Sequence, residues 1–169
     1  MRAKRTERGA TLLEGAVVSL LLFTLLLAIL GFGRAFNIYQ VVTDAAREGA
    51  RYAVAPDPAN SYSLPSATNV ATRVCDYLQA AHISFASGSC GLASGPGGPT
   101  CASGGTIPPA VAPGVYVLQG CLQTVNTIQT YYTEVDVKVP YRLFGLPFTV
   151  NLTTRAVMRN EATTQTYGN

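Results

Sequence analysis

The chain has 169 residues and a formal net charge of +3, and only 12% of its residues are charged. An average soluble domain has about 25% charged residues, and the mean hydropathy of this chain is +0.22. These values argue against an ordinary freely soluble domain. They predict one modest domain with appendages, in a protein that is linked to a membrane or prone to assemble.

The positive charge is concentrated at the N-terminus. Residues 1–9 carry the whole net charge of +3, and from Ala10 onward eight basic residues balance eight acidic ones. Nucleic-acid binding needs a basic face on the folded domain, so the neutral body of this chain predicts no nucleic-acid partner. A short basic N-terminus followed by apolar sequence is instead typical of a membrane topology signal.

An uncharged apolar segment extends from Gly15 to Gly33. It has nearly the length of about 20 residues that a helix needs to cross a bilayer. The basic residues before it predict that the N-terminus stays in the cytoplasm and that the chain after Arg34 lies on the opposite side of the membrane. A secretory signal peptide fits less well, because its apolar region is shorter and ends at a small-residue cleavage site, and none follows closely here.

The helical pattern continues beyond the apolar segment. Apolar residues recur at spacings of three and four along one helix face, and Pro56 and Pro58 predict its end. We therefore expect one helix over residues 10–54, with its first half in lipid and its amphipathic second half packed against the rest of the chain. The residues of this stripe are Phe32, Phe36, Tyr39, Val42, Ala46, Ala50 and Ala53.

The carboxylate of Glu14 stands at the start of the apolar segment and has two interpretations. Thr11 and Glu14 have the spacing of a capping box, which would make Glu14 only a helix cap. Alternatively, a basic segment, Gly9, a small residue, a glutamate five places after the glycine and an apolar helix together resemble the type IV prepilin signal. That resemblance implies that a prepilin peptidase cuts between Gly9 and Ala10 on the cytoplasmic face.

Cleavage at this position would leave a positive amine on Ala10. If apolar helices pack side by side, Glu14 of one subunit can lie near the Ala10 amine of its neighbour. An unpaired charge inside a membrane costs on the order of 2.5–3.5 kcal/mol. The pairing would therefore set the axial stagger between subunits, as buried polar residues set register in coiled coils.

A more specific resemblance rests on three strings of residues. The strings Arg8–Glu14, Gly31–Phe36 and Ala45–Ala53 (AAREGARYA) resemble those of the TadE-like proteins, and residues 152–159 resemble the closing strand of that family. The resemblance implies a pilin-like subunit of the tight-adherence, Flp-type pilus machinery in the inner membrane. Its implied partners are the prepilin peptidase and other pilin-like subunits, contacted through the N-terminal helix.

The remaining chain predicts an α+β head. Residues 69–81 have helical spacing, with Val70, Val74, Leu78 and Ala81 on one side and with Ser66 or Thr68 as the cap. The Gly/Ser/Pro-rich residues 83–114 predict a loop without regular structure. Period-two alternation in residues 115–122, 133–139 and 148–158 predicts an antiparallel meander with one solvated face and one face covered by the two helices.

The polar residues of the head predict no catalytic or cofactor site. Glu134 and Asp136 share one strand face with Lys138 and are interpreted as a solvated row of charges. His82 ends the short helix, where a cation is mildly favoured. No phosphate loop, nucleophile motif or zinc spacing is present in the sequence, so we expect neither an enzyme nor a metal protein.

Four cysteines follow the apolar segment, at Cys75, Cys90, Cys101 and Cys121. An exported location permits disulfides, and four cysteines allow three pairings between which the sequence does not choose. The pairing we favour joins Cys90 to Cys101 across the glycine-rich loop and Cys75 to Cys121 between helix and strand.

Taken alone, the sequence favours a non-enzymatic pilin-like subunit with three parts. These are a leader over residues 1–9, a transmembrane and stalk helix over residues 10–54, and an exported head over residues 55–169, located in the periplasm or outside the cell in a pilus. The alternative is an uncleaved single-pass membrane anchor whose outer domain binds a partner in the cell envelope.

Overall fold

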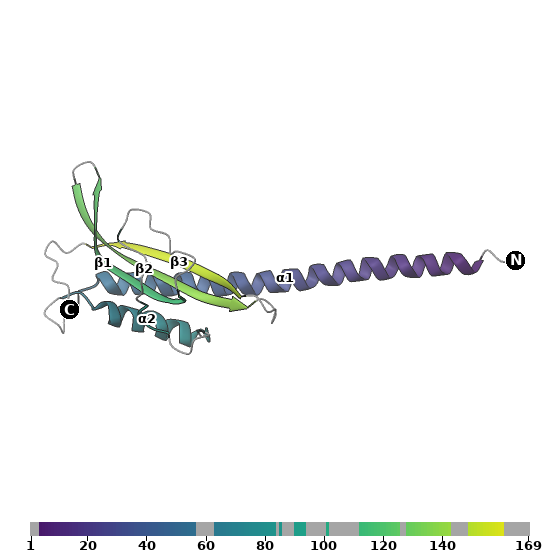
Figure 1. Cartoon of the computed structure of the whole chain (residues 1–169), viewed down its shortest axis with the longest axis horizontal. Coiled ribbons are helices and arrows are strands. Elements are labelled where there is room, and N and C mark those ends of the chain that lie inside the picture. Colours follow the sequence, from purple (N-terminus) through teal and green to yellow (C-terminus); the bar gives the residue numbers. More distant parts are fainter. Residues whose placement is uncertain are drawn as a thin grey trace. The chain divides into compact units, whose positions relative to one another are not determined.

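The computed structural model of the chain describes residues 4–56, 63–83, 85, 90–93, 101, 112–125, 128–142 and 149–160. It contains a long N-terminal helix, a short second helix and a three-stranded antiparallel sheet (Figure 1), so the predicted α+β fold is confirmed. The chain divides into two compact units, Met1–Asn37 and Ile38–Asn169. The division falls inside the long helix, which therefore belongs to both units.

Helix α1 extends from Lys4 to Val54. It is rich in leucine and alanine, which favour helices, and it ends before Pro56, as predicted. The helix starts six residues earlier than predicted, so in the uncleaved chain Thr11 lies inside it and is not its N-cap. The capping interpretation of Glu14 is therefore wrong for the intact chain.

Helix α2 extends from Ala67 to Ala80. Ser66 is its N-cap, since the hydroxyl Oγ accepts a hydrogen bond of 3.3 Å from the backbone N–H of Asn69. The apolar side consists of Val70, Ala71, Val74 and Leu78, all of them buried. Ala81, which the pattern assigned to this side, is the exposed C-cap.

The end of α2 is closed by a paired hydrogen-bond motif. The N–H of His82 donates to the carbonyl of Gln79, and the N–H of Ile83 donates to the carbonyl of Leu78, both at 2.9 Å. This is the Schellman arrangement, which needs a left-handed residue just after the C-cap. His82 takes that position with φ of 58°, a conformation in which glycine would be less strained.

The sheet contains β1 (Gly114–Val125), β2 (Ile128–Arg142) and β3 (Thr149–Arg159) in the order β1-β2-β3. The predicted antiparallel meander is confirmed. The register between β1 and β2 shifts between Leu118 and Cys121, and Gly120 has a φ of 71° there. Such a bulge moves the following side chains to the opposite face of the sheet.

Most of the predicted loop 83–114 lies outside the described residues. Of the described part, Phe85 is buried in the core, and Leu92 forms a parallel bridge with Val115 at the outer edge of β1. The N–H of Ala93 donates to the carbonyl of Val115 at 2.7 Å. This short extension of the sheet was not predicted, because its residues carry no strand pattern.

The core of the second unit lies between the sheet and the two helices. The C-terminal part of α1 contributes mostly small residues, which lets the helices and the sheet approach closely. A Cβ atom added at Gly49 would collide with Cγ2 of Val74 and lie 3.4 Å from Cγ1 of Val135. The buried core residues are Val42, Ala45, Ala46, Ala50, Ala53, Val70, Ala71, Val74, Leu78, Phe85, Val115, Val135, Val137, Val139 and Ala156.

The opposite face of β2 is buried as well, which corrects the prediction of a solvated row of charges. The exposed fractions are 1% for Glu134, 0% for Asp136 and 1% for Lys138, beside 0% for Val135 and Val137. The alternation of valines and charged residues predicted the strand correctly. Both faces of the strand are buried, however, instead of one buried and one solvated face. The sequence pattern of the strand alone does not show whether other parts of the chain cover its polar face.

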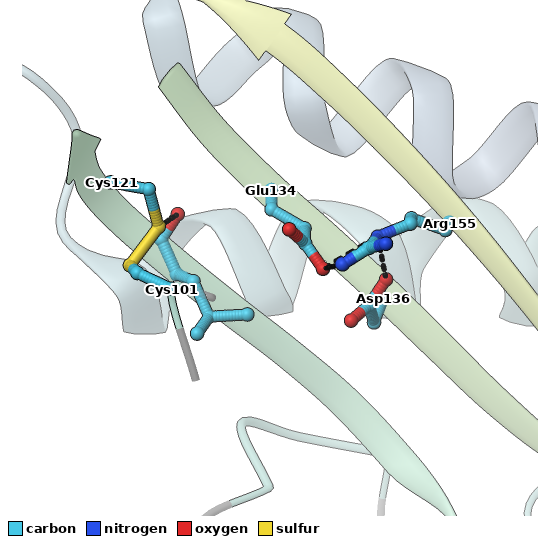
Figure 2. A network of polar contacts seen from close by, with 6 residues as sticks. Cys101, Cys121, Glu134, Asp136 and Arg155 are labelled. Atoms are coloured by element: carbon cyan, nitrogen blue, oxygen red, sulfur yellow. Dashed lines mark hydrogen bonds and ion pairs between the residues drawn. A yellow bond between two sulfur atoms is a disulfide. The ribbon is translucent and has the colours of Figure 1, made fainter. Parts of the chain in front are cut away.

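The disulfides join Cys75 to Cys90 and Cys101 to Cys121, so the pairing favoured from the sequence is wrong. The bulge in β1 explains the difference. Cys121 is the register partner of Tyr132, which shares a face of β2 with Glu134, so its side chain points away from the helices (Figure 2). Cys75 on α2 packs against the core on the helix side and therefore lies on the wrong side of the sheet for Cys121.

Candidate functional site: the apolar helix and the buried charge cluster

The residues predicted to act in processing and assembly lie together on the first turns of α1. Gly9, Ala10 and Glu14 are all helical, and Gly9 and Glu14 are exposed. Glu14 is the sole charged residue between Ala10 and Gly33. An exposed carboxylate thus stands at the start of an apolar helix.

The first unit exposes an apolar surface along the helix on both sides of Glu14 in the sequence. Its large apolar side chains range from 43% exposed at Leu27 to 77% at Phe32. A contiguous surface of this kind is unstable in water and marks contact with lipid or with other protein. Among the described residues, α1 is the one helix that is long and apolar enough to cross a membrane. The exposed residues of this surface are Leu12, Leu13, Val17, Val18, Leu20, Leu21, Leu22, Phe23, Leu25, Leu26, Leu27, Ile29, Leu30, Phe32 and Phe36.

The polar and small groups within this surface are compatible with an apolar environment. The hydroxyl of Thr24 donates to the carbonyl of Leu20 at 2.8 Å, which satisfies it inside its own helix. Gly15 and Gly33 have no atom within 4 Å of a Cβ built on them. Unlike Gly49, they are not required to be small by contacts within the chain.

A second cluster of functional interest lies between β2 and β3. Arg155 donates from Nε to Oε1 of Glu134 at 2.6 Å, and its Nη2 also contacts Oε1. The same Nε lies 3.6 Å from Oδ1 of Asp136. Figure 2 shows the three side chains converging on the sheet face that carries the Cys101–Cys121 disulfide.

Burial and charge strongly shift the acid–base behaviour of this cluster. Desolvation raises the pKa of Asp136 to about 7, the adjacent carboxyl group of Glu134 adds to the rise, and Arg155 opposes it. On the neighbouring strand β1, burial also raises the pKa of Tyr116. Tyr116 donates from its hydroxyl to the carbonyl of Ala112 at 2.6 Å, so its own proton is engaged away from Asp136.

In the part of the chain that the structure describes, no three His, Cys, Asp or Glu side chains gather as a metal site would require. His82, the one histidine of the chain, is exposed at the end of α2. Glu48 and Arg73 form an exposed ion pair at 3.2 Å that links α1 to α2.

Sequence reasoning did not identify Arg155 as part of a site. The available signal was the cation at the centre of β3, where an antiparallel meander brings it opposite the acidic residues of β2. The register confirms that signal, since Arg155 is the partner of Asp136. Using it would have required the strand ends to within one residue, and the predicted boundaries were not that accurate.

Comparison with known proteins supports the resemblance noted in the sequence. The model of a protein family described as TadE-like protein matches residues 9–51. Searches of the curated proteins and of the solved structures found no match. The matched segment contains Gly9, Ala10 and Glu14, the exposed apolar surface, and most of the small residues that pack α1 into the core. Over residues 9–51 the chain is therefore similar to the TadE-like family.

Proposed function

We propose that the chain is a pilin-like structural subunit of a Tad/Flp-type pilus, either a minor pseudopilin or a filament component. One observation carries the proposal: the TadE-like segment 9–51 coincides with an apolar helix whose large side chains are exposed. A structural subunit uses such a helix twice, first in the lipid of the inner membrane and then against the helices of neighbouring subunits.

In this proposal the leader, residues 1–9, is removed by a prepilin peptidase that cuts between Gly9 and Ala10 in the cytoplasm. Gly9 supports the assignment because a residue without Cβ lets the backbone approach a protease closely, and it is exposed. Residues 10–54 then form the transmembrane and stalk helix, and residues 55–169 form a head in the periplasm or outside the cell. The two disulfides support an oxidising location for the head.

Glu14 aligns the subunits in this scheme. Its carboxylate is exposed and lies in an otherwise uncharged segment, so burial among apolar helices stabilises the assembly only where a cation meets it. The amine of a cleaved Ala10 on a neighbouring copy is such a cation. Any other stagger leaves Glu14 unpaired and is disfavoured by on the order of 2.5–3.5 kcal/mol.

The first experiment determines the N-terminus of the native protein. Intact mass and N-terminal sequencing of material from native membranes should show a chain that begins at Ala10 when the peptidase is active and at Met1 when it is inactivated. Gly9→Val should block processing, whereas Gly15→Ala, a second glycine of the same helix with open space around it, should be processed normally. Native protein that retains Met1 beside an active peptidase would support the uncleaved membrane anchor instead.

The second experiment tests assembly. Glu14→Ala should insert into the membrane like the wild type and lose at least about tenfold in incorporation into sheared pili, the effect of 1.4 kcal/mol or more. Thr24→Val is the matched control, because the Thr24 hydroxyl is bonded within its own helix and its loss should leave assembly unchanged. Normal incorporation of the Glu14→Ala subunit would rule out the pairing role.

A further inference from the structure

We propose that Glu134 and Asp136 together hold one proton inside the folded head and that its loss, as the medium becomes alkaline, weakens the pairing of β2 with β3. The two carboxyl groups thus form a pH-sensitive interaction within the sheet. It depends on the fold of the second unit and is independent of the proposed pilus function.

The first support is an imbalance of hydrogen bonds. Glu134 and Asp136 are neighbours on one face of β2, and both are fully buried. The described residues offer them one guanidinium, that of Arg155, whose Nε and Nη2 both donate to Glu134. Neither oxygen of Asp136 has a hydrogen-bond partner, and a buried ionised carboxylate in that condition is costly.

A proton on Asp136 removes this cost. It neutralises one of the two adjacent carboxyl groups and provides the hydroxyl that donates to Glu134, which stays ionised against Arg155. Two carboxyl groups that share a site commonly hold a single proton in this way, because the two charges repel each other. The elevated pKa of Asp136 described above has the same origin.

The other charged and titratable groups around Asp136 are consistent with this assignment. On β1 its register partner is Tyr116, whose hydroxyl is bonded to Ala112. On β2 the same face carries Lys138, a buried cation with interactions of its own. On β3 the register partner is Arg155, which lies nearer to Glu134. Arg155 contacts both carboxyl groups of the pair.

The direction of the pH effect follows from the two pKa values of Asp136. The ordinary value is 3.8 and the value in the fold is about 7, so between these limits the folded chain binds a proton that the unfolded chain has released. Stability therefore falls as the pH rises through this window and levels off above it. The equilibrium constant for unfolding should increase by up to about tenfold per pH unit within the window.

The test is urea denaturation of the full-length chain in detergent micelles at pH 5, 6, 7 and 8, followed by the near-ultraviolet circular dichroism of its tyrosines. We expect the urea midpoint of the wild type to fall from pH 5 to pH 7 and to level off toward pH 8. Asp136→Asn should remove most of this decrease, and Asp76→Asn, which changes an exposed aspartate on α2, should retain it. An Asp136→Asn variant with the wild-type pH dependence would overturn the proposal.

A second measurement decides the question should Asp136→Asn not fold. The infrared spectrum of the folded wild type in heavy water should contain the carbonyl stretch of a protonated carboxylic acid at pH 6, and the band should disappear by pH 8. The exposed carboxylates of the chain are ionised at both pH values. Absence of the band at pH 6 would overturn the proposal without any variant.

Discussion

Arg155 of β3 is the register partner of Asp136 on β2, yet its guanidinium donates its close hydrogen bonds to Glu134. The side chain thus reaches diagonally across the strand pair instead of straight across. Diagonal neighbours on antiparallel strands lie within reach of long side chains. The consequence is a diagonal ion pair between a partly exposed arginine and a buried glutamate. The direct partner, Asp136, is a second buried carboxyl group that has no close hydrogen bond to the arginine.

The diagonal ion pair predicts that removing the arginine strongly destabilises the head and that a second substitution partly restores its stability. Arg155→Met should lower the free energy of unfolding by about 2–4 kcal/mol, because it removes a cation that contacts both buried carboxyl groups. The double variant Arg155→Met with Glu134→Gln should recover a substantial part of that loss. Urea denaturation at pH 7 measures both, and equal instability of the single and double variants would contradict the ion-pair explanation.

Close packing at Gly49 predicts that a better helix former destabilises the protein. Alanine is favoured over glycine inside a helix by about 1 kcal/mol, but a Cβ at this position meets the side chain of Val74. We expect Gly49→Ala to lower the free energy of unfolding of the second unit by about 1–3 kcal/mol, which is the usual cost of overpacking a core. Gly33 lies on the same helix with open space around it, so Gly33→Ala should not lower the stability. Thermal denaturation of the two variants measures the difference. A Gly49→Ala variant more stable than the wild type would refute the packing argument.

The left-handed conformation of His82 predicts a stabilising substitution. His82→Gly should raise the free energy of unfolding by about 1 kcal/mol, because glycine adopts positive φ without a Cβ clash. His82→Ala should give no such gain, since alanine keeps the clash. The melting temperatures of the two variants distinguish a backbone effect from loss of the imidazole, and equal gains in both would favour the latter.

The disulfide pattern is open to direct mapping. Trypsin is unsuitable, because no lysine or arginine occurs between Arg73 and Lys138 and all four cysteines fall in one peptide. Chymotrypsin can cut after Phe85, Leu92 and Tyr116, which separates the four cysteines from one another. Under non-reducing conditions, mass spectrometry should then find Cys75 joined to Cys90 and Cys101 joined to Cys121.

Loss of one bridge should have a measurable cost. The double variant Cys75→Ala with Cys90→Ala should lower the free energy of unfolding by about 2–4 kcal/mol, since the unfolded chain regains the freedom of a closed loop. Reduction of the wild type before denaturation should give a larger loss than this variant. A chymotryptic product that joins Cys90 to Cys101 would restore the pairing expected from the sequence.

Much of the fold was predictable because periodicity reports local structure. The long apolar helix, a cap at Ser66 or Thr68 and the order of the three strands follow from the spacing of apolar residues and from proline and hydroxyl residues at the helix ends. The same reasoning failed for the polar face of β2, because its burial depends on residues outside the strand. Glu134, Asp136 and Lys138 alternate with valines as an exposed row would, and their burial depends on contacts that the strand sequence does not contain.

The disulfide prediction failed for a local reason with a non-local effect. Without the bulge near Gly120, Cys121 would share a face with Val115 and Val117 and would point toward α2. One additional residue in the strand reverses this parity. A glycine within a strand pattern is a known sign of a bulge, but the resulting shift is fixed only by pairing with β2.

The two disulfide loops follow one another along the chain without overlapping, which limits how far the head can lengthen under tension. A fully extended chain spans about 3.3–3.6 Å per residue. The bridges span sequence separations of 15 and 20 residues, and they withhold about 50 Å and about 70 Å of contour from any force applied at the ends. A head pulled apart mechanically would therefore reach a taut, shortened length in oxidising surroundings and yield its full extension only after reduction.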